Sequence, residues 1–387
     1  MRVAGLDLYG AIGGTAACRR LSTAFYTRVA RDPVLRPFFP GKTMKCAIEE
    51  FAAFLVQFLG GPAEDSQRRW WLSLRESHLR FRIGPRERSA WLGLMAKALE
   101  EAQIEEPART ALLAFFEQSS AYVVNTENMV AGGGERQGRI DQEIARRWVA
   151  QRELDEAVAA VRCEDAERAI GLAESGSLPE LFARDHGILA GLLEMMMTSR
   201  NQAMLRWVRD RIAGDPSLVR EHYAGRTLLH AASACGSFAL VELLLRVGAD
   251  PNVADGGGHT ALYSVANQCG TSEGASVVRI LADAGADVNA DDGVKRCTPL
   301  HMAARRGNAR VAAALLDCGA DIEARDSLGE TPLRRAVNCN KPEVAALLIG
   351  RGANVHSVGS KGLTPLSAAR TRAMKEVLRE RRPSSII

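Results

Sequence analysis

Apolar side chains recur at helical spacing through the first third of the chain. Four stripes of this kind predict four amphipathic helices, over residues 21–29, 48–59, 91–99 and 112–123. Asp32-Pro33 follows the first stripe and Gly60-Gly61-Pro62 follows the second, and both are typical helix terminators. A shorter segment between the second and third stripes places Leu74, His78 and Phe81 on one helical face. We therefore expect an all-helical domain in this region.

A different pattern begins at Gly225, where a threonine followed by a short apolar run recurs at intervals of 33, 38, 33 and 33 residues. Four of the five units continue to Gly-Ala-Asp or Gly-Ala-Asn. Each threonine is expected to cap a first helix, which Gly236 and Gly307 end in a left-handed conformation. The five extra residues of the second unit are expected in the loop at 267–276. The pattern resembles the ankyrin family, which implies helix pairs stacked into an α-solenoid.

The segment between these two patterns is charged and prone to form helices. Gly132-Gly133-Gly134 marks a flexible break near residue 130. Ile140, Ile144 and Trp148 lie at helical spacing, which predicts an amphipathic connector helix over 138–175 or, alternatively, a dimer seam. Two apolar helices over 184–216 are interpreted as a degenerate first repeat. The expected domains are a first domain over 5–130, a helical linker over 131–180 and repeats over 181–382.

Composition excludes several classes of protein. Hydrophobic residues make up 47% of the 387 residues and charged residues 25%, which is typical of a soluble globular protein. A net charge of +4 is too small to predict a nucleic-acid partner, and the longest charge-free apolar run, 51–63, is too short to span a membrane. The eight cysteines include no C-x-x-C pair, which favours a reducing, cytoplasmic location and excludes a covalent c-type haem.

The aromatic residues are concentrated in the first domain, together with a single imidazole. Residues 1–130 hold 15 of the 21 aromatic side chains, and His78 is the only histidine among the first 185 residues. One interpretation of His78 is a buried histidine that bonds to a neighbour. The other is an axial ligand to haem iron, which needs one imidazole on an apolar helix face beside a wide aromatic slot.

Four sequence segments favour the second interpretation. They are, in chain order, "LYGAIGG" (8–14), "FYTRVARDPVLRPFFP" (25–40), "FLVQFLGGP" (54–62) and "SHLRFRIGPRERSAWL" (77–92). These segments resemble the group II truncated haemoglobins, in a register that runs without gaps from Tyr9 to about Leu99. The resemblance implies a shortened two-over-two helical globin with non-covalent haem b as its cofactor. The expected fold class is therefore all-α: a truncated globin, a helical connector and an ankyrin-repeat solenoid.

The resemblance also implies roles for individual residues. His78 corresponds to the proximal histidine, the axial protein ligand of the haem iron. Tyr26 and Trp91 correspond to the distal tyrosine and tryptophan, whose O–H and N–H groups donate hydrogen bonds to the bound gas. Ala47 occupies the gate position where many globins carry a distal histidine. The positions of the apolar wall correspond to Phe39, Phe51, Phe54 and Phe81.

One position departs from the family. Glu50 stands where the family often has a basic residue near the haem propionates, which a carboxylate would repel. The candidates to compensate for this charge are Lys42, Lys45, Arg75 and Arg82, and Arg75 is included in the expected haem-binding set.

Two classes of function remain open at this point. The first is a haem protein that reversibly binds O2, NO or CO and uses its ankyrin repeats to bind a protein partner, as in gas sensing. The second is a haem enzyme, such as an NO dioxygenase or a peroxidase, that docks through its ankyrin repeats and takes electrons from an outside donor. A third alternative, an ankyrin scaffold with a vestigial globin, is disfavoured because His78, Tyr26 and Trp91 are all present.

Overall fold

The computed structural model describes residues 8–39, 43–62, 78, 81–124, 139–199, 201–269, 272–359 and 362–380. The chain forms two compact units, Met1–Met195 and Met196–Ile387. Both are helical, as expected, and the one sheet among the described residues is a two-stranded hairpin. Among these residues, no helix combines the length and the apolar character needed to cross a membrane.

The four predicted stripes of the first unit coincide with four helices. Gly60 ends the helix of the second stripe with a positive φ of 79°, and Gly84-Pro85 starts the helix of the third. The last residue of the fourth stripe, Val123, lies just beyond its helix. The elements of this region are α1 (Leu8–Ala11), α2 (Gly14–Val29), η1 (Arg36–Phe38), α3 (Lys45–Leu59), α6 (Pro85–Glu101) and α7 (Ala108–Tyr122).

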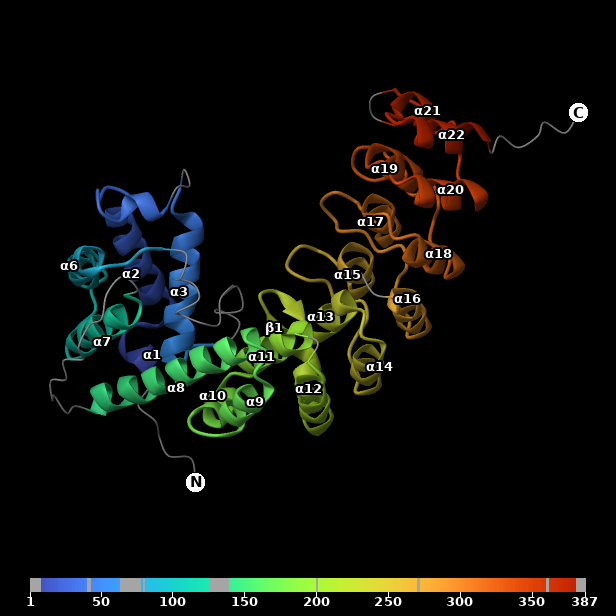
Figure 1. Cartoon of the computed structure of the whole chain (residues 1–387). Coiled ribbons are helices and arrows are strands. Elements are labelled where there is room, and N and C mark those ends of the chain that lie inside the picture. Colours follow the sequence, from blue (N-terminus) through green and yellow to red (C-terminus); the bar gives the residue numbers. More distant parts are fainter. Residues whose placement is uncertain are drawn as a thin grey trace, which may run out of the picture. The chain divides into compact units, whose positions relative to one another are not determined.

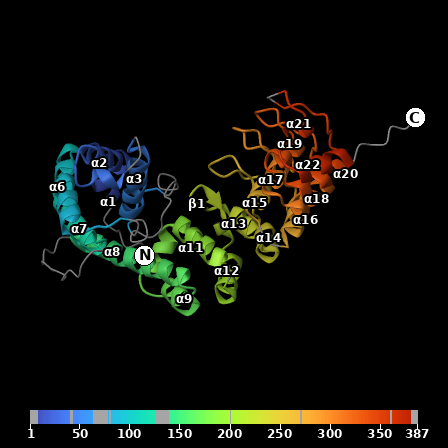
Figure 2. The same ribbon diagram turned by 45° about the horizontal axis from the view of Figure 1, so that its top comes forward.

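These helices pack in two pairs. Helix α2 packs against α3, α6 packs against α7, and α2 also contacts α6, so that α2 lies between α6 and α3 in both views (Figure 1 and Figure 2). The Ser22 hydroxyl donates a hydrogen bond to the Ile48 carbonyl at 2.7 Å and ties the first pair together. Arg88 Nε donates to Ser120 Oγ at 3.1 Å and ties the second. This is the two-over-two arrangement that the resemblance implied.

The segment after this domain folds into four helices. They are α8 (Arg139–Arg162), α9 (Ala166–Glu174), α10 (Leu178–Arg184) and α11 (His186–Ser199). The connector expected over 138–175 is helical, but it is not a single helix, because the chain breaks between α8 and α9. Glu164 takes a positive φ of 58°, and the Asp165 carboxylate caps α9 by accepting the Arg168 N–H at 3.1 Å. An aspartate at an N-cap competes with continuation of the preceding helix.

The second unit begins with a helix and a short hairpin and continues as stacked helix pairs. First helices α13, α15, α17, α19 and α21 pack side by side in one layer, and second helices pack likewise in another (Figure 1 and Figure 2). The elements are α12 (Gln202–Gly214), η2 (Pro216–Arg220), β1 (His222–Tyr223), β2 (Arg226–Thr227), α13 (Leu228–Cys235), α14 (Phe238–Arg246), α15 (Ala261–Gln268), α16 (Gly274–Asp283), α17 (Pro299–Arg306), α18 (Ala309–Asp317), α19 (Pro332–Asn338), α20 (Pro342–Gly350), α21 (Pro365–Ala368) and α22 (Arg372–Glu380).

The predicted start and stop signals of the repeats are confirmed. The recurring threonine is the N-cap of each first helix, and in the third repeat Thr298 Oγ1 accepts the His301 N–H at 3.5 Å. Gly236 and Gly307 end α13 and α17 with φ values of 68° and 85°. A side chain with a Cβ would be strained at these angles, so glycine fixes where each first helix ends.

The five extra residues of the second repeat do not all lie in one loop. Five residues separate α15 from α16, whereas two separate α13 from α14, and α16 has ten residues against nine in α14. The following loop is also longer, with 11 positions from Asp287 to Thr298 against 10 from Asp250 to Thr260. The prediction of a single insertion at 267–276 is therefore only partly right. One residue lengthens the loop that precedes the third repeat.

Two buried histidines link neighbouring repeats. His230 Nδ1 accepts the Thr227 N–H at 3.3 Å, so its Nε2 carries the ring proton and donates to the His259 carbonyl at 2.9 Å. His301 Nε2 donates in the same way to the Glu330 carbonyl at 3.0 Å. Both rings thus bond to the next repeat as well as within their own, which gives them a structural role.

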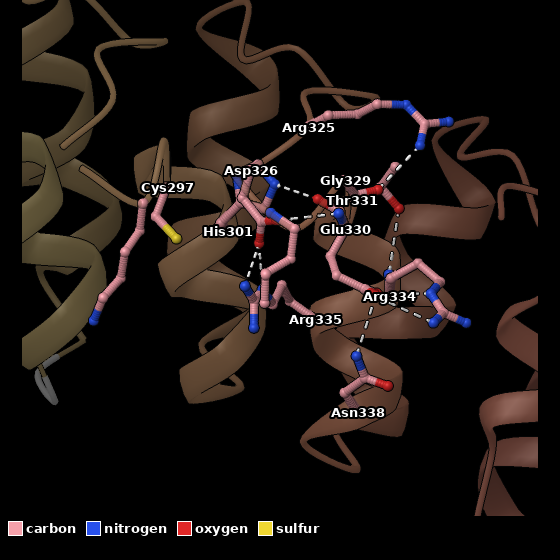
Figure 3. Close-up of polar contacts among 12 residues, drawn as sticks. Cys297, His301, Arg325, Asp326, Gly329, Glu330, Thr331, Arg334, Arg335 and Asn338 are labelled. Carbon is pink, nitrogen blue, oxygen red and sulfur yellow. Dashed lines mark hydrogen bonds and ion pairs between the residues drawn. The ribbon is translucent and has the colours of Figure 1, made fainter. Parts of the chain in front are cut away.

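The fourth repeat has an arginine where the first and third have histidine. Arg334 Nε and Nη2 donate to the Glu330 carboxylate at 2.8 and 3.3 Å, and Asn338 Nδ2 also donates to it (Figure 3). Arg335 Nε donates to Asp326 Oδ2 at 2.6 Å. Arg334 and Glu330 are both buried, and an ion pair in such a place is tolerated only with hydrogen bonds of this kind.

The buried ion pair restricts the repeat that follows it. Gly359 lies five residues before the threonine of the fifth repeat, where the second and fourth repeats have Asp255 and Asp326. A Cβ atom on Gly359 would overlap the Glu330 carboxylate and lie 2.9 Å from Arg334 Nη2. Only glycine fits beside this pair without displacing it.

Acid should destabilise the ankyrin repeats through His230 and His301. Burial lowers the pKa of both imidazoles below the ordinary value. In the unfolded chain the same rings take up protons as the pH falls below about 6.5, whereas the folded rings resist protonation. Unfolding then takes up protons, so the free energy of unfolding should decrease as the pH is lowered from about 7 to about 5. Urea titrations followed by circular dichroism would measure this.

A His301→Gln variant should lose part of this pH dependence, because it removes one of the two rings. His356→Gln is the matched control, since His356 is exposed. An equal pH dependence in the wild type and His301→Gln would contradict the assignment.

Candidate functional site

Several aromatic rings of the first domain pack on its core yet stay partly exposed. They come from separate elements: Tyr26 from α2, Phe39 from the end of η1, Phe51 from α3 and Trp91 from α6. Beneath them Phe25 is almost completely buried. The core therefore ends on this side in a surface of aromatic rings instead of polar side chains.

Phe25 holds the two expected hydrogen-bond donors close together. Its ring centroid lies 5.0 Å from that of Tyr26 and 5.2 Å from that of Trp91. Tyr26 in turn meets Phe39 edge to face at 5.4 Å and Phe51 at 6.2 Å. Trp91 packs against Phe116 of α7 at 5.5 Å. The structure thus brings the predicted residues Tyr26, Trp91, Phe39 and Phe51 into one cluster.

His78 is joined to this cluster through Phe81. The carbonyl of His78 accepts the Phe81 N–H at 3.0 Å, and the Phe81 ring lies 6.1 Å from Phe39 and 5.5 Å from Phe38. His78 itself is half-buried. The imidazole is therefore carried on a segment whose next aromatic ring packs against the same rings that surround Tyr26.

The remaining predicted residues lie at the edge of the aromatic cluster or outside the residues that the structure describes. Phe54 is buried and stacks on Phe51 at 6.3 Å, so it supports the wall from within the core. Ala47 lies half-buried in the first turn of α3. Of the four candidate cations, Lys45 and Arg82 are exposed, while Lys42 and Arg75 fall outside the described residues.

Phe25 and Phe116 also belong to this cluster, although the sequence predicted only that they lie on helical stripes. Both stand behind the donors, and Phe25 separates Tyr26 from Trp91. A signal was present, since Phe25 is the middle residue of its stripe and directly precedes Tyr26. The stripe showed that Phe25 was buried but could not show which ring from α6 would meet it.

The residues present fit a flat, apolar group that carries a metal ion. The partly exposed rings of Tyr26, Phe39, Phe51, Phe81 and Trp91 offer an aromatic surface that a planar macrocycle would cover. The Trp91 indole N–H makes no hydrogen bond to any residue that the structure describes. One imidazole can serve as an axial ligand of a haem, and a phenol and an indole can donate hydrogen bonds to a small polar ligand.

Comparison with known proteins agrees with this fit. The family model of bacterial-like globins matches residues 7–125. Group 2 truncated hemoglobin YjbI of Bacillus subtilis is 34% identical over 117 residues, which cover 30% of this chain and 87% of that protein. Through this segment the chain belongs to the group 2 truncated haemoglobins. Group 2 truncated hemoglobin 3-1 of Lotus japonicus is 32% identical over 107 residues, 27% of this chain and 64% of that protein.

The second unit of this truncated haemoglobin matches ankyrin repeats. The family model for ankyrin repeats (3 copies) matches residues 195–292 and 270–359. Ankyrin repeat and SOCS box protein 16 of Homo sapiens is 39% identical over 107 residues, 28% of this chain. The chain spans only 23% of that protein, so the similarity concerns the repeats alone.

Helix α8 completes the core of the truncated haemoglobin domain. Trp148, only 8% exposed, packs edge to face on Phe115 at 5.6 Å and on Tyr122 at 5.3 Å. Arg147 Nη1 donates to the Phe58 carbonyl at 2.9 Å, at the end of α3. Two alternatives were expected for this segment, a connector and a dimer seam. Trp148 packs in the core of its own chain, which does not favour the dimer seam.

Trp148→Ala should destabilise the truncated haemoglobin domain by about 3–5 kcal/mol, as is usual when a buried Trp is truncated. Urea unfolding followed by circular dichroism at equal protein concentration would measure the loss. Val149→Ala changes the adjacent, exposed side chain and should stay within about 0.5 kcal/mol of the wild type. Equal effects of the two substitutions would show that α8 does not contribute to this core.

Proposed function

We propose that the N-terminal domain binds non-covalent haem b and a diatomic gas, O2, NO or CO, and that the ankyrin repeats bind a protein partner in response. The observation that carries the proposal is the packing of Tyr26 and Trp91 on Phe25, within the aromatic cluster to which Phe81 joins His78. Membership in the truncated haemoglobins supports the haem. The similarity to ankyrin proteins supports the protein partner.

His78 would hold the iron, because it is the only imidazole in the first domain. When bound, haem would supply an iron that can bind a diatomic ligand. Phe39, Phe51, Phe54 and Phe81 would exclude water from the cofactor, since their rings offer no hydrogen-bonding groups. That basic side chains, Arg75 among them, pair with the haem propionates stays a prediction.

Tyr26 and Trp91 would select the ligand through their hydrogen bonds. Each brings one donor, a phenolic O–H and an indole N–H, and Phe25 fixes the separation between them. Haem-bound dioxygen would carry partial negative charge and would gain from both donors, whereas bound carbon monoxide would carry little. Ala47 offers only a methyl group and therefore adds no third donor at the gate.

The cysteines support a cytoplasmic location for this function. All eight are free thiols, and Cys46, Cys163 and Cys339 are exposed. Exposed free thiols are typical of proteins in a reducing compartment.

Replacing His78 with alanine should abolish haem binding. Absorption spectra of the purified full chain, with and without dithionite and CO, would show loss of the haem bands and partial recovery with added imidazole. His186→Ala, the next histidine along the chain, is the control and should keep the wild-type spectrum. A His78→Ala protein with unchanged haem content and spectrum would refute the assignment.

Tyr26→Phe and Trp91→Phe should each accelerate O2 dissociation by about tenfold or more. A charge-assisted hydrogen bond contributes about 1.5–3 kcal/mol, and about 1.4 kcal/mol corresponds to a factor of ten. CO dissociation should change far less. Stopped-flow measurements on both ligands would decide this.

Tyr9→Phe is the matched control, because the Tyr9 hydroxyl already accepts the Thr15 N–H at 2.9 Å. If neither Tyr26→Phe nor Trp91→Phe alters O2 release beyond its effect on CO, these donors do not face the ligand.

A further inference from the structure

Most of the exposed large apolar side chains lie on loops of the ankyrin repeats. Among the described residues five such side chains are exposed, and Val149 in α8 is the only one outside these loops. The loops in question connect the second helix of one repeat to the first helix of the next, and we call them fingers. The four finger residues are Val294 (80% exposed), Leu328 (55%), Val358 (48%) and Leu363 (40%).

These fingers lie side by side. The Ser327 N–H of one finger donates to the Lys295 carbonyl of the preceding finger at 2.7 Å. Arg325 Nη1 donates to the Gly329 carbonyl of its own finger at 3.0 Å (Figure 3). It also donates to the Val358 carbonyl of the following finger at 3.2 Å. The fingers that carry the exposed apolar side chains are therefore joined to one another, and we define the finger surface by Val294, Leu328, Val358 and Leu363.

Three acidic groups beside these tips, Asp292, Asp326 and Glu330, are turned inward, whereas Asp291 is exposed and pairs with Arg296. Asp292 is buried and accepts the Lys295 N–H at 2.7 Å. Asp326 is also buried and accepts the Leu328 N–H at 2.8 Å as well as the Arg335 guanidinium. Glu330 is held by Arg334, and Figure 3 shows both carboxylates engaged within the fourth repeat.

The cations at the tips remain available. Lys295 and Arg325 are exposed, and neither forms an ion pair with any carboxylate in the described part of the chain. Arg296 is also exposed, but its Nε lies 3.5 Å from Asp291. The finger surface thus combines four aliphatic side chains with two uncompensated positive charges.

The finger before the second repeat lacks these features. Its tip is Gly256-Gly257-Gly258, and the adjacent His259 is engaged with Asp255 at 3.0 Å. The next finger is one residue longer, and Gly293 and Arg296 take positive φ values of 65° and 52° on either side of the exposed Val294. The contact chemistry is therefore confined to the last three fingers.

We propose that the finger surface binds an extended segment of a partner protein in which aliphatic side chains are interspersed with aspartate or glutamate. This inference rests on the proposed role of the ankyrin repeats as a protein-binding array. Aliphatic partner side chains would cover Leu328 and its neighbours, and carboxylates would pair with Lys295 and Arg325. A nucleic acid fits less well, because its phosphates would meet apolar side chains at each of these tips.

The test is selection from a random-peptide display library on the purified full-length protein, with counter-selection on a Val294→Ser/Leu328→Ser variant. The enriched peptides should be rich in aliphatic residues and carry net negative charge. The most enriched peptide, labelled with fluorescein, would then be titrated by anisotropy. Leu328→Ser should weaken its binding about tenfold, the usual effect of losing a buried aliphatic contact.

Charge exchange provides a second, independent measurement. Lys295→Glu should weaken binding of the acidic peptide. The same variant should bind more tightly to a second peptide in which lysine replaces each acidic residue. The affinity of the wild type for the acidic peptide should also fall as salt is raised. Val149→Ser and Arg310→Gln are matched controls, because both change exposed residues outside the fingers, and they should bind as the wild type does.

Each other outcome overturns the inference. Enriched peptides that are neutral or basic, or that bind the finger variants equally well, would refute this surface but leave a protein-binding array intact. Absence of any enrichment would refute both the surface and the proposed role of the repeats. Binding of a labelled single-stranded DNA that depends on Lys295 and Arg325 would assign the cations to nucleic acid.

Discussion

The packing of Phe25 is the contact on which the truncated haemoglobin domain depends. Its buried ring lies between Tyr26 on its own helix and Trp91 on α6, and it also meets Phe51 on α3 at 6.0 Å. One side chain therefore sets the separation of both hydrogen-bond donors and joins three helices. Because ring contacts of this kind are directional as well as apolar, a smaller side chain here would loosen the site and the core together.

The same aromatic core extends away from the site to the helix that follows the domain. Trp91 packs on Phe116, Phe116 on Phe115, and Phe115 on Trp148 of α8, with centroid distances of 5.5, 5.2 and 5.6 Å. Helix α8 is therefore part of the globin core instead of a free spacer. The cost of separating it would include exposure of Trp148 and loss of the hydrogen bond from Arg147 to the end of α3.

Local patterns predicted the helices and the repeats, because periodicity and capping act within a few residues. The threonine caps, the glycines at helix ends and the four stripes were all readable in this way. Contacts between distant segments were not: nothing near Trp148 shows that it would meet Phe115, and nothing near Phe25 shows that Trp91 would pack on it. The break after α8 was missed because helical spacing outweighed the single capping signal of Asp165.

The site was predicted from its resemblance to a family more than from its residues. Spacing alone left His78 open between a structural and a ligating role. The structure adds the clustering of Tyr26, Trp91, Phe39 and Phe51, which no sequence interval could supply. The sequence could not distinguish Arg75 from the other cations able to compensate for Glu50 near the propionates, because the reach of a long side chain depends on the path of the backbone.

The glycine that faces the buried ion pair bears on how freely these repeats can be recombined. Arg334 and Glu330 fill the space that a side chain at position 359 would otherwise take, and the fifth repeat has glycine there in place of the aspartate found in the second and fourth. The two repeats therefore share a constraint and form a matched pair. In a shuffled array, an aspartate-bearing repeat placed after the fourth would force the carboxylate of Glu330 away from Arg334. The fourth and fifth repeats can therefore be moved only as a pair.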